Sequence, residues 1–233
     1  MKHIKGLNYT LFIVFILALV SCADTLIGDE GQLDEDIYLN YQTITDLELP
    51  FEEEWHIEVG GRTHRANFHH FVSRSERYAS DIVIEIDGRI RIGDGSNNED
   101  HHCFGKRLNA PGNGKIIELE NNVDDNQPGK INRDQPGGNY IIIDHLNGES
   151  SIMAHLKKGS IIVSLGDTVM KGQEIGKAGN SGASTAPHLH YELRGTEGAL
   201  NGVGLPAQFV NYYEDNAFTE RGELDNGQKV RKN

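Results

Sequence analysis

The chain has 233 residues, enough for one domain of ordinary size together with tails. It carries 35 acidic and 22 basic residues, which gives a formal net charge of -13 at pH 7. Polyanions repel so acidic a chain, and the composition therefore argues against nucleic acid as a partner and against electrostatic docking on anionic lipid.

The first 21 residues have the pattern of an export signal. Lys2 and Lys5 precede an uninterrupted apolar run from Leu11 to Val20, which is too short to span a bilayer but suits the core of a signal peptide. The run ends in Leu-Val-Ser-Cys, which resembles a bacterial lipobox. We expect residues 1–21 to be a lipoprotein signal peptide, with lipid on Cys22 anchoring an exported protein at the cell envelope, on the periplasmic face or the outer membrane of a Gram-negative cell. The alternative is an ordinary signal peptide or a short anchor, with an incidental cysteine.

The rest of the chain predicts one all-β domain. Residues 22–45 are acidic and lack periodicity, which indicates a tether; residues 46–215 form the domain, and residues 216–233 are expected to be a polar tail. Within the domain, short runs rich in β-branched residues alternate with glycine-containing turns, and no stretch keeps the apolar period of a helix. The expected strands include residues 47–60, 81–86, 115–120, 140–144, 151–155, 161–163 and 190–193. Between two of them, residues 121–138 form a long polar loop that is expected to rim a groove.

The most informative stretch runs from Gly179 to Leu193. It begins as a Gly-Asn-Ser-Gly turn and continues through Pro187 into His-Leu-His-Tyr-Glu-Leu, which is typical of a strand. Residues two apart on a strand project from the same face, so His188 and His190 lie together. Two such imidazoles can bind a metal ion, or one can bind metal while the other moves protons. Taken alone, His-x-His is equally compatible with two surface histidines.

This stretch resembles the signature of the lysostaphin/LytM-type zinc endopeptidases, which cut peptides in bacterial peptidoglycan. The similarity extends upstream through Met153-Ala154-His155-Leu156 and through Gly166 to Gly176. The resemblance implies an antiparallel β-sandwich or open barrel, with hairpins in the style of lipoyl and biotinyl domains. It also implies one zinc ion per chain and peptidoglycan peptides as the substrate.

The resemblance assigns zinc ligands residue by residue. His190 matches the second histidine of the family's His-x-His, and Asp81 matches its aspartate. The usual histidine four residues before the aspartate is replaced by Arg77, which cannot ligate a cation. One branch of the family supplies this ligand from an Asn-x-His or Asn-His-His segment further upstream. We predict that His70 is the first ligand, with His69 as the alternative.

The same resemblance gives His155 and His188 catalytic roles beside the metal. One would take the proton of the attacking water, and the other would stabilise the oxyanion or protonate the leaving amine. The sequence does not assign the two roles. Histidine suits both, because its ordinary pKa lies near 6.5.

Two other functions compete with a zinc endopeptidase. A catalytically inactive module of the same fold would bind the cell wall or activate another wall hydrolase. Such modules typically have their ligand positions replaced, whereas here only the first histidine is displaced and a substitute is present. A cell-surface lipoprotein with structural zinc would need four protein ligands, and the sequence supplies three. His101-His102-Cys103 is poorly arranged to chelate one ion, because adjacent residues of an extended chain point in opposite directions.

Overall fold

The computed structural model describes residues 40–63, 65–198 and 201–233, and Tyr41–Asn233 form one compact unit. The predicted signal peptide, Cys22 and most of the predicted tether lie outside the described residues. No helix in the described part of the chain is long and apolar enough to cross a membrane.

The described residues are almost entirely strands and loops, which confirms the all-β prediction. Two short 3-10 helices, η2 (Phe68–Phe71) and η3 (Asn98–Asp100), interrupt the strands. The strands are β1 (Trp55–Val59), β2 (Ser80–Val83), β3 (Arg107–Asn109), β4 (Gly114–Glu120), β5 (Asn139–Asp144), β6 (Glu149–Leu156), β7 (Thr168–Val169), β8 (Glu174–Lys177), β9 (Leu189–Gly195), β10 (Gly204–Leu205), β11 (Gln208–Glu214), β12 (Ala217–Glu223) and β13 (Lys229–Lys232). The expected strand at residues 161–163 is irregular, because the bond from Ile162 N to Ile175 O (3.1 Å) does not continue as a ladder.

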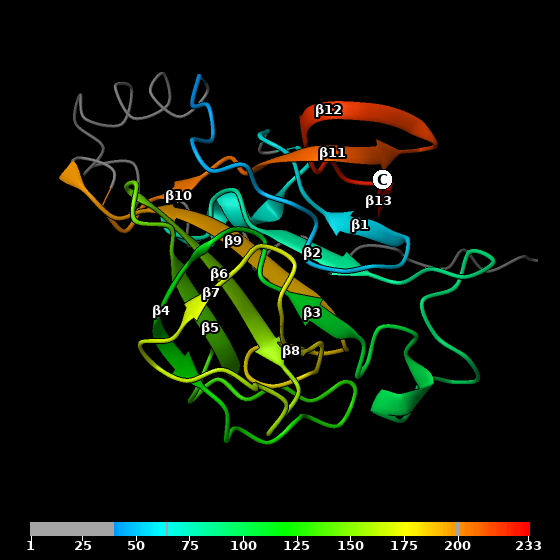
Figure 1. Cartoon of the computed structure of the whole chain (residues 1–233). Coiled ribbons are helices and arrows are strands. Elements are labelled where there is room, and N and C mark those ends of the chain that lie inside the picture. The colour runs from blue at the N-terminus through cyan, green and yellow to red at the C-terminus, as the bar shows by residue number, and fades with distance from the viewer. Residues whose placement is uncertain (1–39, 64, 199–200) are drawn as a thin grey trace, which may run out of the picture. The chain divides into compact units, whose positions relative to one another are not determined.

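One large sheet contains most of the described strands (Figure 1). Its order is β12-β11-β13-β1-β2-β9-β6-β5-β4-β7, with β10 paired to β9, while β3 and β8 form a separate two-stranded sheet. The pairs between these strands are antiparallel, as predicted. Strands β2, β9, β6, β5 and β4 are consecutive neighbours, so residues distant in sequence share one continuous face.

The alternation of β9 separates the hydrophobic core from a polar face. Leu189, Tyr191 and Leu193 are at most 1 % exposed and pack into the core. His190 and Glu192 point from the opposite face and are also buried. A strand buried on both sides holds its side chains in fixed directions, and β9 is therefore a rigid support for the residues discussed below.

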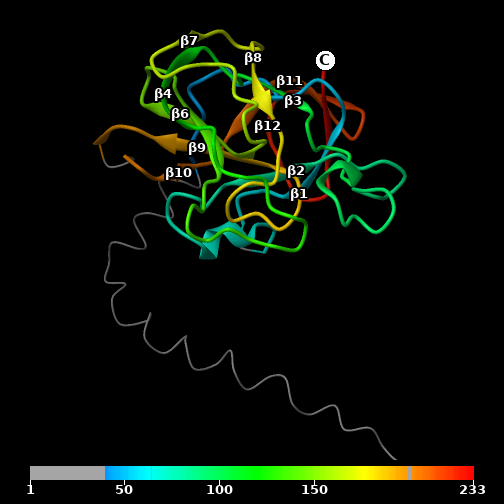
Figure 2. The same cartoon turned by 90° about the horizontal axis from the view of Figure 1, so that it is seen from below.

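The C-terminal segment is part of the domain and not the polar tail that was predicted for residues 216–233. Strand β12 pairs with β11, and β13 lies between β11 and β1, with Trp55 opposite Val230. The C-terminal strands, coloured orange to red, lie on the β1 side of the sheet, with β13 next to β1 and β12 at the edge (Figure 1 and Figure 2). The segment has few apolar residues because β12 is an edge strand with largely exposed side chains, and backbone hydrogen bonds hold it instead.

The N-terminal boundary also differs from the predicted tether over residues 22–45. The buried Glu149 carboxylate accepts hydrogen bonds from the Tyr41 hydroxyl (2.6 Å), the Ile44 amide (2.7 Å) and the Thr45 amide (2.8 Å). Thr43 is buried, and its hydroxyl donates to Pro206 O (3.0 Å). Residues 41–45 are therefore docked on the domain by polar contacts, which an apolar pattern does not reveal.

Candidate metal centre

The pairing of β2 with β9 places an aspartate directly beside a histidine. Asp81 is the register partner of His190, and the Asp81 Oδ1 atom lies 2.8 Å from His190 Nδ1. Both side chains are largely buried, with 13 % and 7 % of their surface exposed. Two residues separated by 109 positions in sequence thus form a fixed donor pair.

A third donor, His69, comes from the short helix η2. The Asn67 side chain accepts a hydrogen bond from the His69 amide (2.9 Å) and donates one to Ala79 O (2.8 Å), so it ties η2 to the start of β2. This arrangement places His69 Nε2 3.0 Å from Asp81 Oδ2. The candidate ligand atoms of His69, Asp81 and His190 all lie within 4.8 Å of one another.

The structure does not bring the predicted ligand His70 to this cluster. The His70 ring packs edge-on against Tyr78, with ring centroids 4.9 Å apart. A 3-10 helix has three residues per turn, so neighbouring side chains point about 120° apart and only one of the pair can face Asp81. The alternative residue, His69, takes this place. The cap from Asn67, two positions before His69, was the sequence signal that could have distinguished them.

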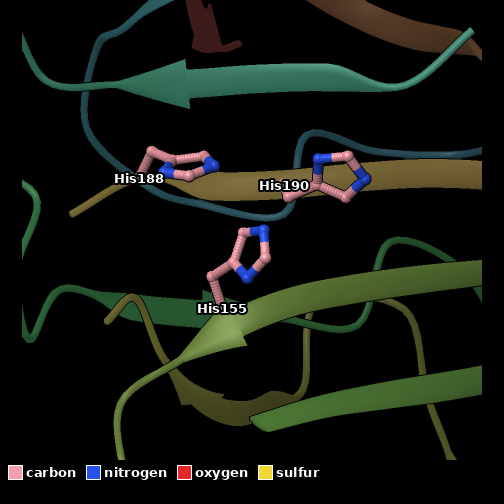
Figure 3. Close-up of side chains that lie close together, drawn as sticks. All are labelled: His155, His188 and His190. Atoms are coloured by element: carbon pink, nitrogen blue, oxygen red, sulfur yellow. The ribbon is translucent and has the colours of Figure 1, made fainter. Parts of the chain in front are cut away.

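His155 and His188 lie next to His190 (Figure 3), and His188 Nε2 is also 3.5 Å from Asp81 Oδ1. Their rings are 4.9 Å apart, and the His155 ring is 5.4 Å from that of His190. His155 Nδ1 lies 2.8 Å from Ser181 O, and His188 Nδ1 lies 2.9 Å from Ala186 O. A carbonyl only accepts hydrogen bonds, so each Nδ1 carries a hydrogen and Nε2 is the ring nitrogen left for other contacts.

The backbone at His155 is strained. Its φ angle is +62°, a left-handed conformation that residues with a side chain rarely adopt. Strain of this kind persists where surrounding contacts over-determine the conformation, and it is frequent at functional sites. Here it turns the His155 side chain at the end of β6 toward His188 and His190.

The electrostatics of the cluster favour a negative carboxylate among imidazoles. Burial alone would raise the pKa of Asp81, but nearby His188 and the hydrogen bonds with His190 and His69 hold it well below its ordinary value. Burial lowers the pKa of His155 well below 6.5, and His188 and His190 lower it further. Burial alone would also lower the pKa of His190, but bonds to Asp81 and Glu192 raise it to about 10. Without metal, His190 is therefore protonated and His155 is neutral.

Glu192 contacts the second ring nitrogen of His190, Nε2. This residue was not identified from the sequence. Its Oε1 atom lies 3.0 Å from His190 Nε2, and its Oε2 atom accepts a hydrogen bond from Arg194 Nε (2.5 Å). Metal-binding histidines usually donate their second ring N–H to such a carboxylate, which fixes the ring and its tautomer. The spacing His-x-His-x-Glu on one strand face is the signal that could have identified it.

The donor set fits zinc. Two imidazole nitrogens and one carboxylate oxygen are ligands that zinc prefers, and three protein ligands with an open position are typical of catalytic sites. His69, Asp81 and His190 supply these donors, with Glu192 behind one of them. His155, His188 and His190 form a second group whose candidate ligand atoms also lie within 4.8 Å of one another, so His190 belongs to both groups. Only the first group contains a carboxylate, which offsets the charge of the metal ion.

The cluster opens into a groove of about 760 Å³. His69, Asp81, His155, His188 and His190 all line it. Ile131, Arg133, Pro136 and Gly137 contribute from the long loop, which confirms that this loop rims a groove. A peptide laid in the groove would therefore contact both histidine groups.

The His-His-Cys segment has a different position. Cys103 is buried, and its thiol donates to Pro187 O (3.1 Å), just before His188. His101 is buried and its Nε2 lies 3.4 Å from Gly95 O. Cys103 thus contacts the turn that leads into β9.

Comparisons with known proteins identify part of the chain. The family model described as Peptidase family M23 matches residues 101–202. Residues 101–202, less than half of the chain, thus match peptidase family M23. The match confirms the predicted lysostaphin/LytM-type family and includes His155, His188 and His190. Asp81 and His69 precede the matched segment, so the structure alone connects them with it.

Curated relatives and solved structures share parts of this chain. The peptidoglycan DD-endopeptidase ShyA of Vibrio cholerae is 47 % identical over 64 residues, or 27 % of this chain and 14 % of the relative. The DD-carboxypeptidase/endopeptidase Mpg of Neisseria meningitidis is 37 % identical over 83 residues, or 35 % of this chain and 19 % of the relative. The matches thus span less than a fifth of these relatives.

Among solved structures, a zinc-containing peptidase from Vibrio cholerae aligns with a TM-score of 0.39 at 18 % identity, covering 69 % of this chain and 38 % of that one. Lysostaphin aligns with a TM-score of 0.34 at 26 % identity, covering 54 % and 39 % of the two chains.

Proposed function

We propose that this chain is a zinc-dependent endopeptidase that hydrolyses peptide bonds in peptidoglycan. The convergence of His69, Asp81 and His190 with His155 and His188 in one groove carries the proposal. The match of residues 101–202 to a peptidase family and the names of the curated relatives support the reaction and the substrate class.

In this proposal, His69, Asp81 and His190 hold the metal. A bound zinc ion would supply Lewis-acid chemistry, lowering the pKa of water and polarising a carbonyl group. Asp81, held anionic by its surroundings, offsets the positive charge, and Glu192 keeps the His190 ring in place.

His155 and His188 handle protons. Each fixes its Nδ1 hydrogen on a backbone carbonyl and offers Nε2 to the groove. One accepts a proton from the attacking water, and the other then donates a hydrogen bond to the developing oxyanion or a proton to the leaving amine. Because the two rings are 4.9 Å apart, both can reach the same scissile peptide bond.

The alternative is an inactive module that binds the wall or activates another hydrolase. The structure offers a specific argument against it. Arg77 stands where the family usually has its first ligand, and His69, 3.0 Å from Asp81, would take over this role. The two histidines proposed to transfer protons, His155 and His188, also lie in the groove. An inactive module would have no need to keep all five side chains together.

The proposed location follows from the N-terminal sequence. The export signal over residues 1–21 and lipid on Cys22 would place the domain at the cell envelope, where peptidoglycan lies. Because Tyr41 is docked on the domain, the predicted tether would end before this residue.

The direct test incubates purified peptidoglycan with the full chain in detergent and identifies the released fragments by mass spectrometry. Cleavage should disappear with a chelator and return with zinc. His155→Ala and His188→Ala should each reduce cleavage by about 10²–10⁴-fold and keep zinc. The matched control is His102→Ala, outside the groove lining, which should cleave normally. Bound zinc without cleavage of any wall type would favour the inactive module.

A further inference from the structure

The groove floor extends away from the metal cluster across the sheet. The register places Glu192 beside Ile152, Ile152 beside Ile142, and Ile142 beside Glu118, on strands β9, β6, β5 and β4. All four side chains line the groove. Neighbouring strands are about 4.8 Å apart, so this row spans about 14 Å, the length of about four extended residues.

The middle of this floor is apolar and its surroundings are charged. Ile142, Ile152 and Ala154 offer contacts for small apolar side chains. Glu118 accepts a hydrogen bond from the Tyr140 hydroxyl (2.5 Å), and this bond, together with burial, raises the pKa of Tyr140 to about 12. The floor thus presents an apolar surface to small side chains and has no positive charge of its own.

Positive charge comes from two arginines, and they differ in what they already bind. Among the described residues that line the groove, the arginines are Arg133 and Arg194. Arg194 already forms an ion pair through its Nε with Glu192, the residue that contacts His190. Arg133 makes no ion pair with any described residue, although the chain has a large excess of carboxylates. Its guanidinium group is therefore available to a ligand.

The backbone on both sides of Arg133 is fixed to the turn before His188. The Asn132 amide donates to Gly182 O (2.9 Å), and the Ala183 amide donates to Pro136 O (2.8 Å). The Asn132 side chain also accepts bonds from the Asp134 amide (3.1 Å) and the Gln135 amide (3.3 Å). These bonds fix the backbone that carries Arg133, so a ligand that binds its guanidinium group need not order the loop.

We propose that Arg133 binds a free carboxylate of the peptide substrate and makes the enzyme prefer peptides that carry one near the scissile bond. This inference rests on the proposed endopeptidase function. A guanidinium group recognises a carboxylate through two parallel hydrogen bonds. Glu76 and Glu118 line the same groove and disfavour a polyanion, so a single carboxylate beside small apolar residues fits better than a phosphate chain.

The test compares two synthetic wall-type peptides that differ only in a free carboxylate or a primary carboxamide beside the scissile bond. The full chain should hydrolyse the carboxylate peptide with a kcat/KM about tenfold or more above that of the amide, in the range of a charge-assisted hydrogen bond. Arg133→Ala should abolish this preference by slowing only the carboxylate peptide, and Arg133→Lys should retain part of it. Lys130→Ala removes the same charge from the same loop outside the groove lining, and should keep the preference.

The outcomes separate the two proposals. Equal hydrolysis of both peptides by the unmodified chain, or an equal loss on both with Arg133→Ala, would overturn the role of Arg133. Hydrolysis of neither peptide would contradict the proposed function. In that case the dissociation constants of the two peptides, measured by calorimetry, still decide whether Arg133 binds the carboxylate. Arg133 is exposed, so its variants are expected to fold, and a thermal melt checks this.

Discussion

Substitution of the neighbouring histidines of η2 tests the metal centre most directly. His69→Ala removes a nitrogen that lies 3.0 Å from Asp81, whereas His70→Ala removes a ring that packs on Tyr78. A structural zinc site with four ligands is worth about 10–16 kcal/mol, or about 3 kcal/mol per ligand. His69→Ala should therefore weaken zinc binding roughly a hundredfold. His70→Ala should leave zinc affinity within about threefold and lower the stability by about 1 kcal/mol, the value of an aromatic contact.

The assay is a competition for zinc with a chromophoric chelator at pH 7.5, together with urea unfolding of the zinc-free chains. The two variants differ by one position in the chain and delete the same chemical group, so each is the control for the other. A hundredfold loss of affinity in His70→Ala with normal affinity in His69→Ala would refute the assignment from the structure. It would restore the ligand expected from the sequence.

Three further predictions concern the support of the site and the extent of the domain. Glu192→Gln should lower zinc affinity about 10–100-fold in the same competition assay, because a neutral glutamine amide accepts a weaker hydrogen bond from His190 than a carboxylate does. The raised pKa of His190 means that its protonated form stabilises the zinc-free fold fully below pH 6.5, and that this contribution is lost as the pH rises through about 10. The melting temperature of the zinc-free chain should therefore fall over this interval, and a flat profile would contradict the pairing with Asp81 and Glu192. Deletion of residues 216–233 removes β12 and β13, and should abolish cooperative unfolding in a calorimetric scan; an unchanged melt would show that these residues are a dispensable tail.

The parts of the site that the sequence predicted belong to local patterns. The placement of His188 and His190 in one groove follows from the two-residue period of a strand, and the turn before it is rich in glycine and asparagine. Asp81 begins a run of β-branched residues, and the structure pairs it with His190. In each case the signal lies within a few residues of the side chain concerned.

The predictions that differ from the structure concern contacts between residues distant in sequence, or the geometry of a short helix. His70 was preferred over His69 because the segment was treated as extended, whereas the Asn67 cap winds it into a 3-10 turn. The C-terminal strands lack apolar alternation, because β12 lies at the sheet edge with both faces largely exposed. The register of a sheet strand depends on its partner, and that partner cannot be identified from the strand itself.

The composition of the long loop, residues 121–138, did not predict the hydrogen bonds that attach it to the turn before His188. Its asparagines and glycines predicted a surface loop, and it does rim the groove. The Asn126 side chain, however, donates to Gly182 O and Ser184 O (both 2.8 Å), and the Asn126 amide donates to Asn180 O (2.8 Å). The same turn provides Ser181 O, which orients His155. The wall that carries Arg133 and the turn that orients a proton-handling histidine thus support one another, so the groove is formed before a peptide arrives and substrate binding need not order this wall.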